Sequence, residues 1–419
     1  MINWKHSGNT LRVSDKDLPA GLLFILRELN QAGHEAFVVG GSIRDIFLNR
    51  TVYDWDVATS ATPVEVMDHF ERVIETGLQH GTVTVCVGKE TYEVTTYRVD
   101  VGASDGRRPD SVRFSTSLTE DLERRDFTMN AMAWNPLTGE LRDPFGGKLA
   151  IDKRLITAVG DAHTRLSEDG LRSLRAARFA AVLGFQVDSS LFRAMGTTLE
   201  ILKKVSVERI WQEMRKLVLG SNAPEGMKML HDTGMLSVIL PDIKFEQGRP
   251  ATQFSNDLSV RLADLFIGQN EVFLKTSNQL KLPKKLTADV VHLLSAAERV
   301  LASGTMVGSD QYLIVSQIRR PYLPMVKMLV LGRCSVTDRE RMFDRFEEFE
   351  RISSSDRPLR VGELPIDGQW IMARFKLRPS RLVGHLLNHC LEESFKTTQF
   401  DQVDFYEAAI EEFLRGNDE

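Results

Sequence analysis

The amino-acid sequence predicts an α+β fold in which a mixed α/β head, residues 1–153, is followed by an all-helical remainder. Helical and strand spacings of apolar residues alternate before about residue 150, and helical spacing dominates after it. The helical part has breaks near residues 222–224, 248–250, 304 and 353–358. We therefore expect a neck, a body and a tail at residues 154–225, 226–345 and 346–419.

Composition restricts the class of protein. Hydrophobic residues make up 42% of the chain and charged residues 26%, as in ordinary globular proteins. The longest apolar runs, such as residues 20–26, are far shorter than a membrane span, and the N-terminus lacks the apolar core of a signal peptide. Cys86, Cys334 and Cys390 are too few and too scattered for a disulfide framework, which favours a cytoplasmic location. Because the net charge is −5, any contact with RNA must come from local basic surface.

The first elements of the head lead to a glycine turn. Four leucines between residues 18 and 29 lie on one stripe of a helix that ends at Gly33. A β-prone apolar run at residues 37–39 precedes Gly40 and Gly41, which give the backbone room for positive φ and for a ligand. Residues 42–48 have helical character, so the N–H groups and dipole at the start of this helix favour an anion such as a phosphate.

Two aspartates follow that turn. Asp54 and Asp56 lie in a predicted strand, where alternation puts both carboxylates on one side and Trp55 on the other. Two hard oxygen ligands beside a phosphate cradle suit Mg²⁺ bound to a nucleotide. Taken alone, a Gly-Gly pair is most often a tight turn and an Asp-x-Asp pair a solvated strand edge. Together, at this spacing, they indicate phosphoryl or nucleotidyl transfer.

The head continues with a hairpin and a loop. Residues 82–87 and 92–97 predict paired strands around a turn at Gly88 and Lys89. Residues 101–113, which are rich in Gly, Asp and Arg, predict a mobile polar loop.

Residues 124–131 combine two adjacent arginines with further polar groups. Arg124 and Arg125 can hold a triphosphate bidentately. Asp126 and Asn130 offer polar groups at ribose distance. The alternative interpretation is a charged helix end followed by an Asp cap.

Residues 168–178 predict a helix that reads a nucleobase. On such a helix Asp169, Arg172 and Arg175 share one face, because residues three apart are neighbours. A carboxylate beside a guanidinium matches the Watson–Crick edges of cytosine and adenine and leaves those of guanine and uracil unpaired. A good bidentate base contact contributes roughly 1–3 kcal/mol, and a buried unpaired polar group costs about as much. The alternative is an amphipathic helix with an ordinary ion pair.

At this point the chain resembles a known family. Five ordered segments resemble motifs A to E of the class II tRNA nucleotidyltransferases, the bacterial CCA-adding enzymes: residues 40–45 with 54–56, 124–131, 143–147, 168–178 and 209–213. The resemblance implies a polymerase-β-like nucleotidyltransferase head and template-independent addition of C, C and A to the 3′ end of tRNA from CTP and ATP, with release of pyrophosphate. Beyond the motifs, the helical remainder resembles the family only in length and class.

The resemblance also implies residue roles. Asp54 and Asp56 would hold two Mg²⁺ ions, and Glu93 is a candidate third carboxylate. The nucleotide would be bound by residues from four of the motifs: Gly41, Arg44 and Arg125 at the triphosphate, Asp126 and Asn130 at the ribose, Asp169 and Arg172 at the base, and Arg175 and Arg178 in support. Arg209 and Glu213 would brace the base-reading helix, and the glycines of residues 143–147 would let the base pocket adjust.

Partners and alternatives follow from the same resemblance. The helical part would hold the acceptor arm and elbow of tRNA, in a monomer or a homodimer. Candidate phosphate contacts are its basic spots, at residues 203–204, 281–285, 319–320 and 374–378. CC-adding relatives lack a loop like residues 101–113, and bacterial poly(A) polymerases usually end in a strongly basic extension. Full CCA addition is therefore favoured over CC-only addition and poly(A) synthesis, and A-only addition stays open as an alternative. A catalytically inactive RNA-binding module is the remote alternative.

Overall fold

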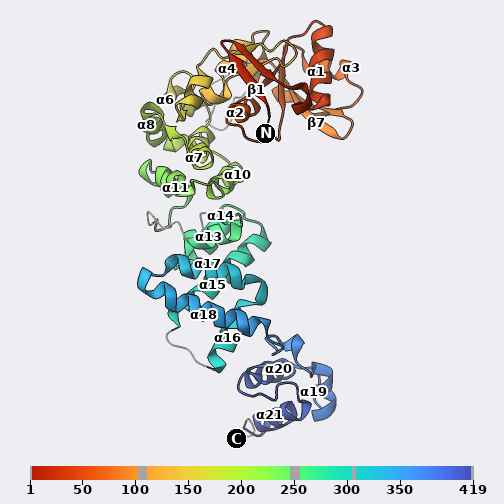
Figure 1. Ribbon diagram of the computed structural model, residues 1–419, viewed down its shortest axis with the longest axis vertical. Helices are drawn as coiled ribbons and strands as arrows, with labels where there is room; N and C mark the ends of the chain where they lie inside the picture. Colours follow the sequence, from red (N-terminus) through yellow and green to blue (C-terminus); the bar gives the residue numbers. More distant parts are fainter. Residues whose placement is uncertain (1, 102–110, 246–254, 304–307, 417–419) are drawn as a thin grey trace. The chain divides into compact units, whose positions relative to one another are not determined.

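The computed structural model describes residues 2–101, 111–245, 255–303 and 308–416. It divides into two compact units, Met1–Asp242 and Ile243–Glu419. The first unit contains a mixed seven-stranded sheet followed by helices, and the second is helical in its described part (Figure 1). This arrangement confirms the predicted α+β class. Among the described residues, no helix has both the length and the apolar character needed to cross a bilayer.

The central sheet runs in the order β11-β10-β3-β4-β7-β6-β5. Its strands are Ala36–Val39 (β3), Asp56–Thr59 (β4), Val73–Gly77 (β5), Thr82–Val87 (β6), Glu90–Thr96 (β7), Ala133–Trp134 (β10) and Leu141–Arg142 (β11). Strands β4 and β7 are parallel, and the other neighbours are antiparallel. The hairpin predicted around Gly88 and Lys89 is confirmed as β6 and β7. Two further hairpins are β1 with β2 (Trp4–Ser7, Thr10–Val13) and β8 with β9 (Arg98–Val101, Ser111–Phe114).

One helix of the first unit, Pro63–His69 (α3), begins at a recognisable signal. Thr62 caps α3 (Pro63–His69) in a capping box with Glu65, and Pro63 occupies the first turn, where its missing N–H does no harm. The others are α1 (Ala20–Gln31), α2 (Gly41–Phe47), α4 (Leu118–Glu123), α5 (Gly147–Asp152), α6 (Ala162–Glu168), α7 (Leu171–Leu183), α8 (Ser189–Thr197), α9 (Leu199–Leu202), α10 (Val207–Val218), α11 (Ala223–Asp232) and α12 (Met235–Ile239). Short pieces complete the unit: β12 (Leu155–Ile156), β13 (Gln186–Val187), η1 (Asp15–Asp17), η2 (Leu78–His80) and η3 (Thr128–Asn130).

The second unit is built from helices in its described part. They are α13 (Leu258–Phe266), α14 (Asn270–Gln279), α15 (Lys284–Ala302), α16 (Ser309–Ile318), α17 (Leu323–Arg333), α18 (Val336–Ser354), α19 (Gly368–Phe375), α20 (Arg381–Ser394) and α21 (Val403–Gly416), with η4 (Arg320–Tyr322) and η5 (Val361–Glu363). The last three helices share a core around Leu386, Cys390 and Tyr406.

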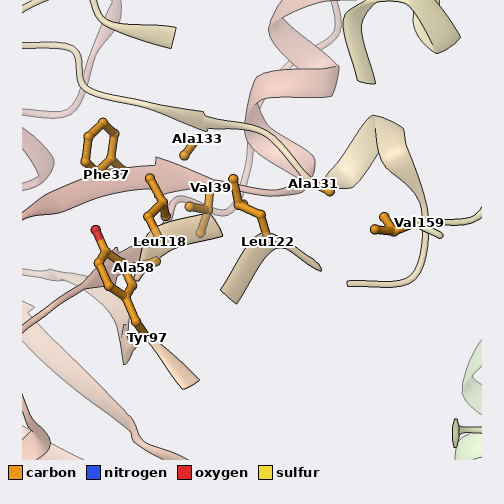
Figure 2. Packing of buried hydrophobic residues seen from close by; sticks show 9 residues of the cluster. All are labelled: Phe37, Val39, Ala58, Tyr97, Leu118, Leu122, Ala131, Ala133 and Val159. Carbon is orange, nitrogen blue, oxygen red and sulfur yellow. The ribbon is translucent and has the colours of Figure 1, made fainter. Parts of the chain in front are cut away.

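One core cluster fixes the region of the sheet that carries the predicted motifs. Its buried side chains come from β3, β4, α4, the segments around η3 and β10, and the residues after β7 and β12: Phe37, Val39, Ala58, Tyr97, Leu118, Leu122, Ala131, Ala133 and Val159 (Figure 2). Because these elements are far apart in sequence, the cluster brings the glycine turn, the aspartates and the arginine pair into one region of the fold.

Three sequence predictions need correction. Asp54 and Asp56 do not share a strand, because β4 begins at Asp56 and Asp54 precedes it. The predicted 101–113 loop is too long at both ends, since Val101 pairs with Ser111 and Val99 with Arg113; residues 102–110 lie outside the described part. Asp169 is not in a helix with Arg172, because α6 ends before it, its backbone is extended, and α7 starts only at Leu171.

Candidate active site

The glycine turn between β3 and α2 brings main chain close to charged side chains. Gly40 has a φ of 80° and a ψ of −133°, which a residue with a side chain rarely adopts. A Cβ on Gly40 would stand 3.1 Å from Nη1 of Arg125 and 3.9 Å from Oδ2 of Asp56. A Cβ on Gly41 would stand 3.3 Å from Nη2 of Arg44. The turn thus lets these three side chains approach its main chain closely.

Acidic groups gather at the start of β4. Val39 of β3 pairs with Asp56, and the parallel pairing of Val57 with Val94 puts Glu93 on the neighbouring strand. Burial, together with the negative charges of Glu93 and Asp54, raises the pKa of Asp56 to about 6 against the opposing attraction of Arg125. Burial is the main cause, and the charges of Glu93 and Asp54 together outweigh that of Arg125, so the nearby charges act in the same direction as burial.

A divalent cation fits this excess of negative charge. Among the described residues, no group of three or more His, Cys, Asp or Glu side chains could hold a metal by itself. Asp54 and Asp56 offer two carboxylates, and Mg²⁺ is usually held by one or two carboxylates together with phosphate oxygens of a substrate. The donor set therefore suits an ion that arrives with a nucleotide better than a permanent structural metal.

The arginine pair is held by a carboxylate that the sequence analysis did not single out. Asp121 of α4 is completely buried and accepts hydrogen bonds from Arg124 (Nη2, 2.7 Å) and Arg125 (Nη2, 3.1 Å). Its spacing of three and four residues from these arginines on one helical run is the signal that could have identified it.

The predicted ribose contacts lie in a buried polar network. Asn130 accepts from Nη1 of Arg44 at 2.7 Å and donates to Oδ1 of Asp126 at 3.1 Å. Oδ2 of Asp126 pairs with Nη2 of Arg175 at 2.6 Å. Burial alone would raise the pKa of Asp126, but the attraction of Arg175 and the hydrogen bonds from Asn130 and Arg175 outweigh it and lower the pKa to about 2. In contrast to Asp56, Asp126 is a fully compensated carboxylate.

Asp169 and Arg172 both have protein partners. Oδ2 of Asp169 pairs with Nη2 of Arg209 at 2.7 Å, and its Oδ1 accepts from the backbone of Leu171 at 3.0 Å. Arg172, only 9% exposed, donates to the main-chain oxygens of Arg165 and Arg124, both at 2.8 Å, and pairs with the Glu168 carboxylate. These contacts use three of the five N–H donors of the Arg172 guanidinium. Base reading would rely on the remaining donors or on a rearrangement.

Two arginines of α7 reach α10. Nε of Arg178 donates to Glu213 at 2.8 Å, and the Arg178 guanidinium lies over the Phe179 ring at 3.5 Å from its centre. Arg175 lies 3.9 Å from the second oxygen of Glu213, which is buried. These contacts fasten α7 to α10, and the Arg209–Asp169 pair fastens α10 to the residues before α7.

The glycine-rich turn of residues 143–147 has a packing role. Asp143 accepts from the backbone N–H groups of Gly147 (2.6 Å) and Lys148 (2.9 Å) at the start of α5. A Cβ on Gly147 would stand 2.3 Å from the main-chain oxygen of Thr128 in η3. Glycine is thus required for the close approach of α5 to the segment that carries Asn130.

Comparison with known proteins finds relatives over most of the chain. The poly A polymerase head domain model matches residues 36–157, and a model described as the probable RNA and SrmB-binding site of polymerase A matches residues 184–246. A CCA-adding enzyme of Lactobacillus delbrueckii subsp. bulgaricus is 37% identical over 407 residues, covering 93% of this chain and 96% of that protein. The chain belongs to the CCA-adding enzyme family. A CCA-adding enzyme of Geobacillus thermodenitrificans is 49% identical over 221 residues, which cover 53% of this chain and 54% of that protein.

Solved CCA-adding enzymes share the fold. The Bacillus stearothermophilus CCA-adding enzyme in complex with CTP superposes with a TM-score of 0.74 at 29% identity, covering 95% of this chain and 98% of that one. The Thermotoga maritima CCA-adding enzyme complexed with tRNA is 16% identical with a TM-score of 0.69, a likeness of fold alone. The predicted family and head fold are thus confirmed. Nucleotidyltransferases of this family depend in general on a divalent metal.

Proposed function

We propose that this chain adds C, C and A to the 3′ end of tRNA from CTP and ATP without a nucleic-acid template and releases pyrophosphate. Membership of the CCA-adding enzyme family supports the reaction. The observation in this chain that carries the proposal is the uncompensated carboxylate of Asp56, which lies with Glu93 and Asp54 beside the Gly40 turn and opposite Arg125.

The catalytic step needs a nucleophile and a bound triphosphate. We assign Asp54 and Asp56 as the ligands of Mg²⁺, with Glu93 beside them. When bound, Mg²⁺ lowers the pKa of an attacking hydroxyl and stabilises the negative charge that develops on phosphate oxygens. Arg125 and the N–H groups of the Gly41 turn receive the triphosphate and orient its α-phosphate toward the tRNA 3′-hydroxyl. The attack forms a bond from the 3′-oxygen to the α-phosphorus and breaks the bond from this phosphorus to the leaving pyrophosphate.

Base choice is assigned to protein side chains. Asp169 supplies an acceptor and Arg172 a donor, the pattern that cytosine and adenine both match. Arg175 and Arg178 hold this part of α7 through Asp126 and Glu213. Asp126 and Asn130 lie next to the ribose in this proposal, and Arg44, which is assigned to the triphosphate, donates a hydrogen bond to Asn130. Exchange of Asp169 or Arg172 would change which nucleotides are added more than how tightly tRNA is bound.

The helical part is assigned to tRNA. We propose that the neck (154–225) carries base reading and that the body (226–345) and tail (346–419) hold the acceptor arm and elbow. We also propose that the protein is located in the cytoplasm. This is supported by the three free cysteines, which form no disulfide in the described residues.

Incubation with a tRNA that lacks its terminal triplet tests the proposal. With Mg²⁺, CTP alone should give two additions, ATP alone none, and both together three. A product that stops after two nucleotides with both substrates present would indicate a CC-adding enzyme, a single A on tRNA ending in CC an A-adding enzyme, and a long A tract a poly(A) polymerase. Incorporation that persists in the Asp54→Ala and Asp56→Ala variants would contradict the metal assignment, and no incorporation by the wild type would leave an inactive RNA-binding module.

A further inference from the structure

Asp121 is a buried charge with two arginine partners. It lies in α4, whose start is capped by Ser117, and its exposed fraction is 0%. Oδ1 accepts from Nε (3.1 Å) and Nη2 (2.7 Å) of Arg124, while Oδ2 accepts from Nη2 of Arg125 (3.1 Å). One carboxylate thus holds two consecutive guanidinium groups, and each of its oxygens serves a different one.

Such an arrangement has a strong electrostatic basis. Burial by itself raises the pKa of Asp121, but the attraction of Arg125 and Arg124 and their hydrogen bonds prevail and lower it, so the carboxylate stays charged. A buried charge is tolerated only when it is paired and hydrogen-bonded. Removing one partner of such a pair leaves the other without compensation. The geometry of the two arginines therefore depends on this carboxylate.

Arg125 is held at one end and directed into the site with the other. Its Nη2 is bound to Asp121, while its Nη1 lies 3.1 Å from the position of a Cβ on Gly40. Oδ2 of Asp56 lies 3.9 Å from that same position. The anchored guanidinium therefore presents Nη1 to the turn at which the triphosphate is proposed to bind.

Arg124 extends the same anchor to the base-reading residue. Its side chain is fixed by Asp121 in two hydrogen bonds, and its main-chain oxygen accepts from Nη2 of Arg172 at 2.8 Å. Displacement of Arg124 would therefore displace a hydrogen-bond partner of Arg172. Asp121 is linked in this way to both halves of the proposed nucleotide site, although it touches neither the metal ligands nor the base.

We propose that Asp121 is a positioning residue that fixes Arg125 for the triphosphate and, through Arg124, fixes Arg172 for the base. This inference rests on the proposed function of the site. It predicts that the charge and length of the residue 121 side chain control nucleotide binding and selectivity, while contacts with tRNA stay unchanged.

The experiment compares three variants of the full chain. Asp121→Asn keeps the shape and removes the charge, and Asp121→Glu keeps the charge on a side chain one methylene longer. Asp264→Asn is the matched control, because Asp264 is a buried carboxylate paired with Arg333 (Nη2, 3.0 Å) in the second unit. Calorimetric binding of CTP is measured for each protein, together with KM for CTP, ATP and truncated tRNA and the ratio of kcat/KM for CTP over UTP.

For Asp121→Asn we expect weaker CTP binding and a KM for CTP and ATP raised on the order of 10- to 100-fold, because misplacing a positioning group by about 1 Å can cost about 100-fold. The CTP/UTP ratio should fall, and KM for tRNA should stay at the wild-type value. Asp264→Asn should lose thermal stability without changing the KM for CTP or ATP. If Asp121→Asn does not fold, Asp121→Glu decides, with an intermediate rise in KM expected.

Wild-type nucleotide binding and KM in both Asp121 variants would overturn the inference, whatever their stability. Failure of the proposed function would give a different result: the wild type would bind CTP but add no nucleotide to tRNA. The effect of Asp121→Asn on CTP binding would still be measured in that case.

Discussion

Replacement of Asp56 by Asn should stabilise the metal-free protein while it abolishes nucleotide addition. The pKa of Asp56 rises from an ordinary value of 3.8 to about 6, chiefly through burial and then through Glu93. Since the pKa of Asp56 is higher in the folded state than in the unfolded state, the protein is most stable when this carboxyl group is protonated. The contribution of the protonated group to the free energy of unfolding is fully present below pH 3.8 and is lost as the pH rises through about 6.

The magnitude follows from the same two values. A pKa difference of one corresponds to about 1.36 kcal/mol, so the rise from 3.8 to about 6 corresponds to about 3 kcal/mol at pH 7. Asn resembles the neutral carboxyl and avoids this penalty. The gap in unfolding free energy between Asp56→Asn and the wild type should therefore be up to about 3 kcal/mol at pH 7 and should shrink toward zero at pH 4.

The assay is denaturant unfolding in the presence of EDTA, followed by hydrogen exchange in β3, β4 and β7, because a chain of two units need not unfold in one step. Saturating Mg²⁺ should narrow the gap, since a ligand of the folded state stabilises the wild type. Asp126→Asn is the matched control with opposite sign. The Asp126 carboxylate has a pKa of about 2 in the folded protein, below the value in the unfolded chain. Its contribution to the free energy of unfolding is therefore present above the unfolded-state pKa and is lost as the pH falls toward 2.

Asp126→Asn should therefore destabilise the protein at pH 7, by about 3–5 kcal/mol if it behaves as a broken buried ion pair. An Asp56→Asn variant that is no more stable than the wild type at pH 7 in EDTA would refute the reasoning. So would a gap that does not depend on pH between 4 and 7.

Three further predictions test other parts of the structure. Gly147→Ala should lower the unfolding free energy by roughly 1–3 kcal/mol through overpacking against Thr128, whereas Gly384→Ala, in open space within α20, should raise it by about 0.5–1 kcal/mol; a thermal melt of each variant checks this, and equal shifts would contradict it. Arg172→Ala should relax the preference for CTP and ATP over GTP and UTP by at least as much as one bidentate contact, roughly 1–3 kcal/mol, as measured by kcat/KM; unchanged selectivity would exclude a base-reading role. Deletion within residues 102–110 should spare addition of CC and abolish the final A, because the sequence resemblance assigns this segment to completion of the triplet, and a variant that still completes all three nucleotides would remove the argument against CC-only addition.

Local sequence signals predicted the parts of the site that local geometry determines. The glycine turn was predictable because Gly40 must adopt a positive φ between an apolar strand and a helix. The β6–β7 hairpin was predictable from two β-rich runs around Gly88. The closeness of Asp56 and Glu93 was less accessible, because it depends on the parallel pairing of β4 with β7, a contact that no local pattern specifies.

The misplaced base-reading residue shows why the rest was not predictable. Helical spacing runs through residues 168–178, yet the chain is extended at Asp169 and the next helix starts at Leu171. Next to this break, Gly170 packs directly against α9, because a Cβ there would stand only 2.6 Å from the main-chain oxygen of Ile201. A tertiary contact thus overrides a continuous helical pattern, and Asp169 pairs with Arg209 of α10 instead of extending the face of Arg172.

Electrostatics distinguishes the aspartates of the first unit that hold arginines in place from the one that is proposed to bind a metal. Asp121 and Asp126 are each compensated by arginines, and both have lowered pKa values. Asp56 is also in a low-dielectric position, but the carboxylates near it outweigh Arg125 and its pKa is raised. A carboxylate that is already paired with arginines is stabilised little by a further cation, whereas an unpaired carboxylate is stabilised most. The electrostatic field of the folded chain therefore favours a metal at Asp56, while Asp121 and Asp126 hold the arginines in place.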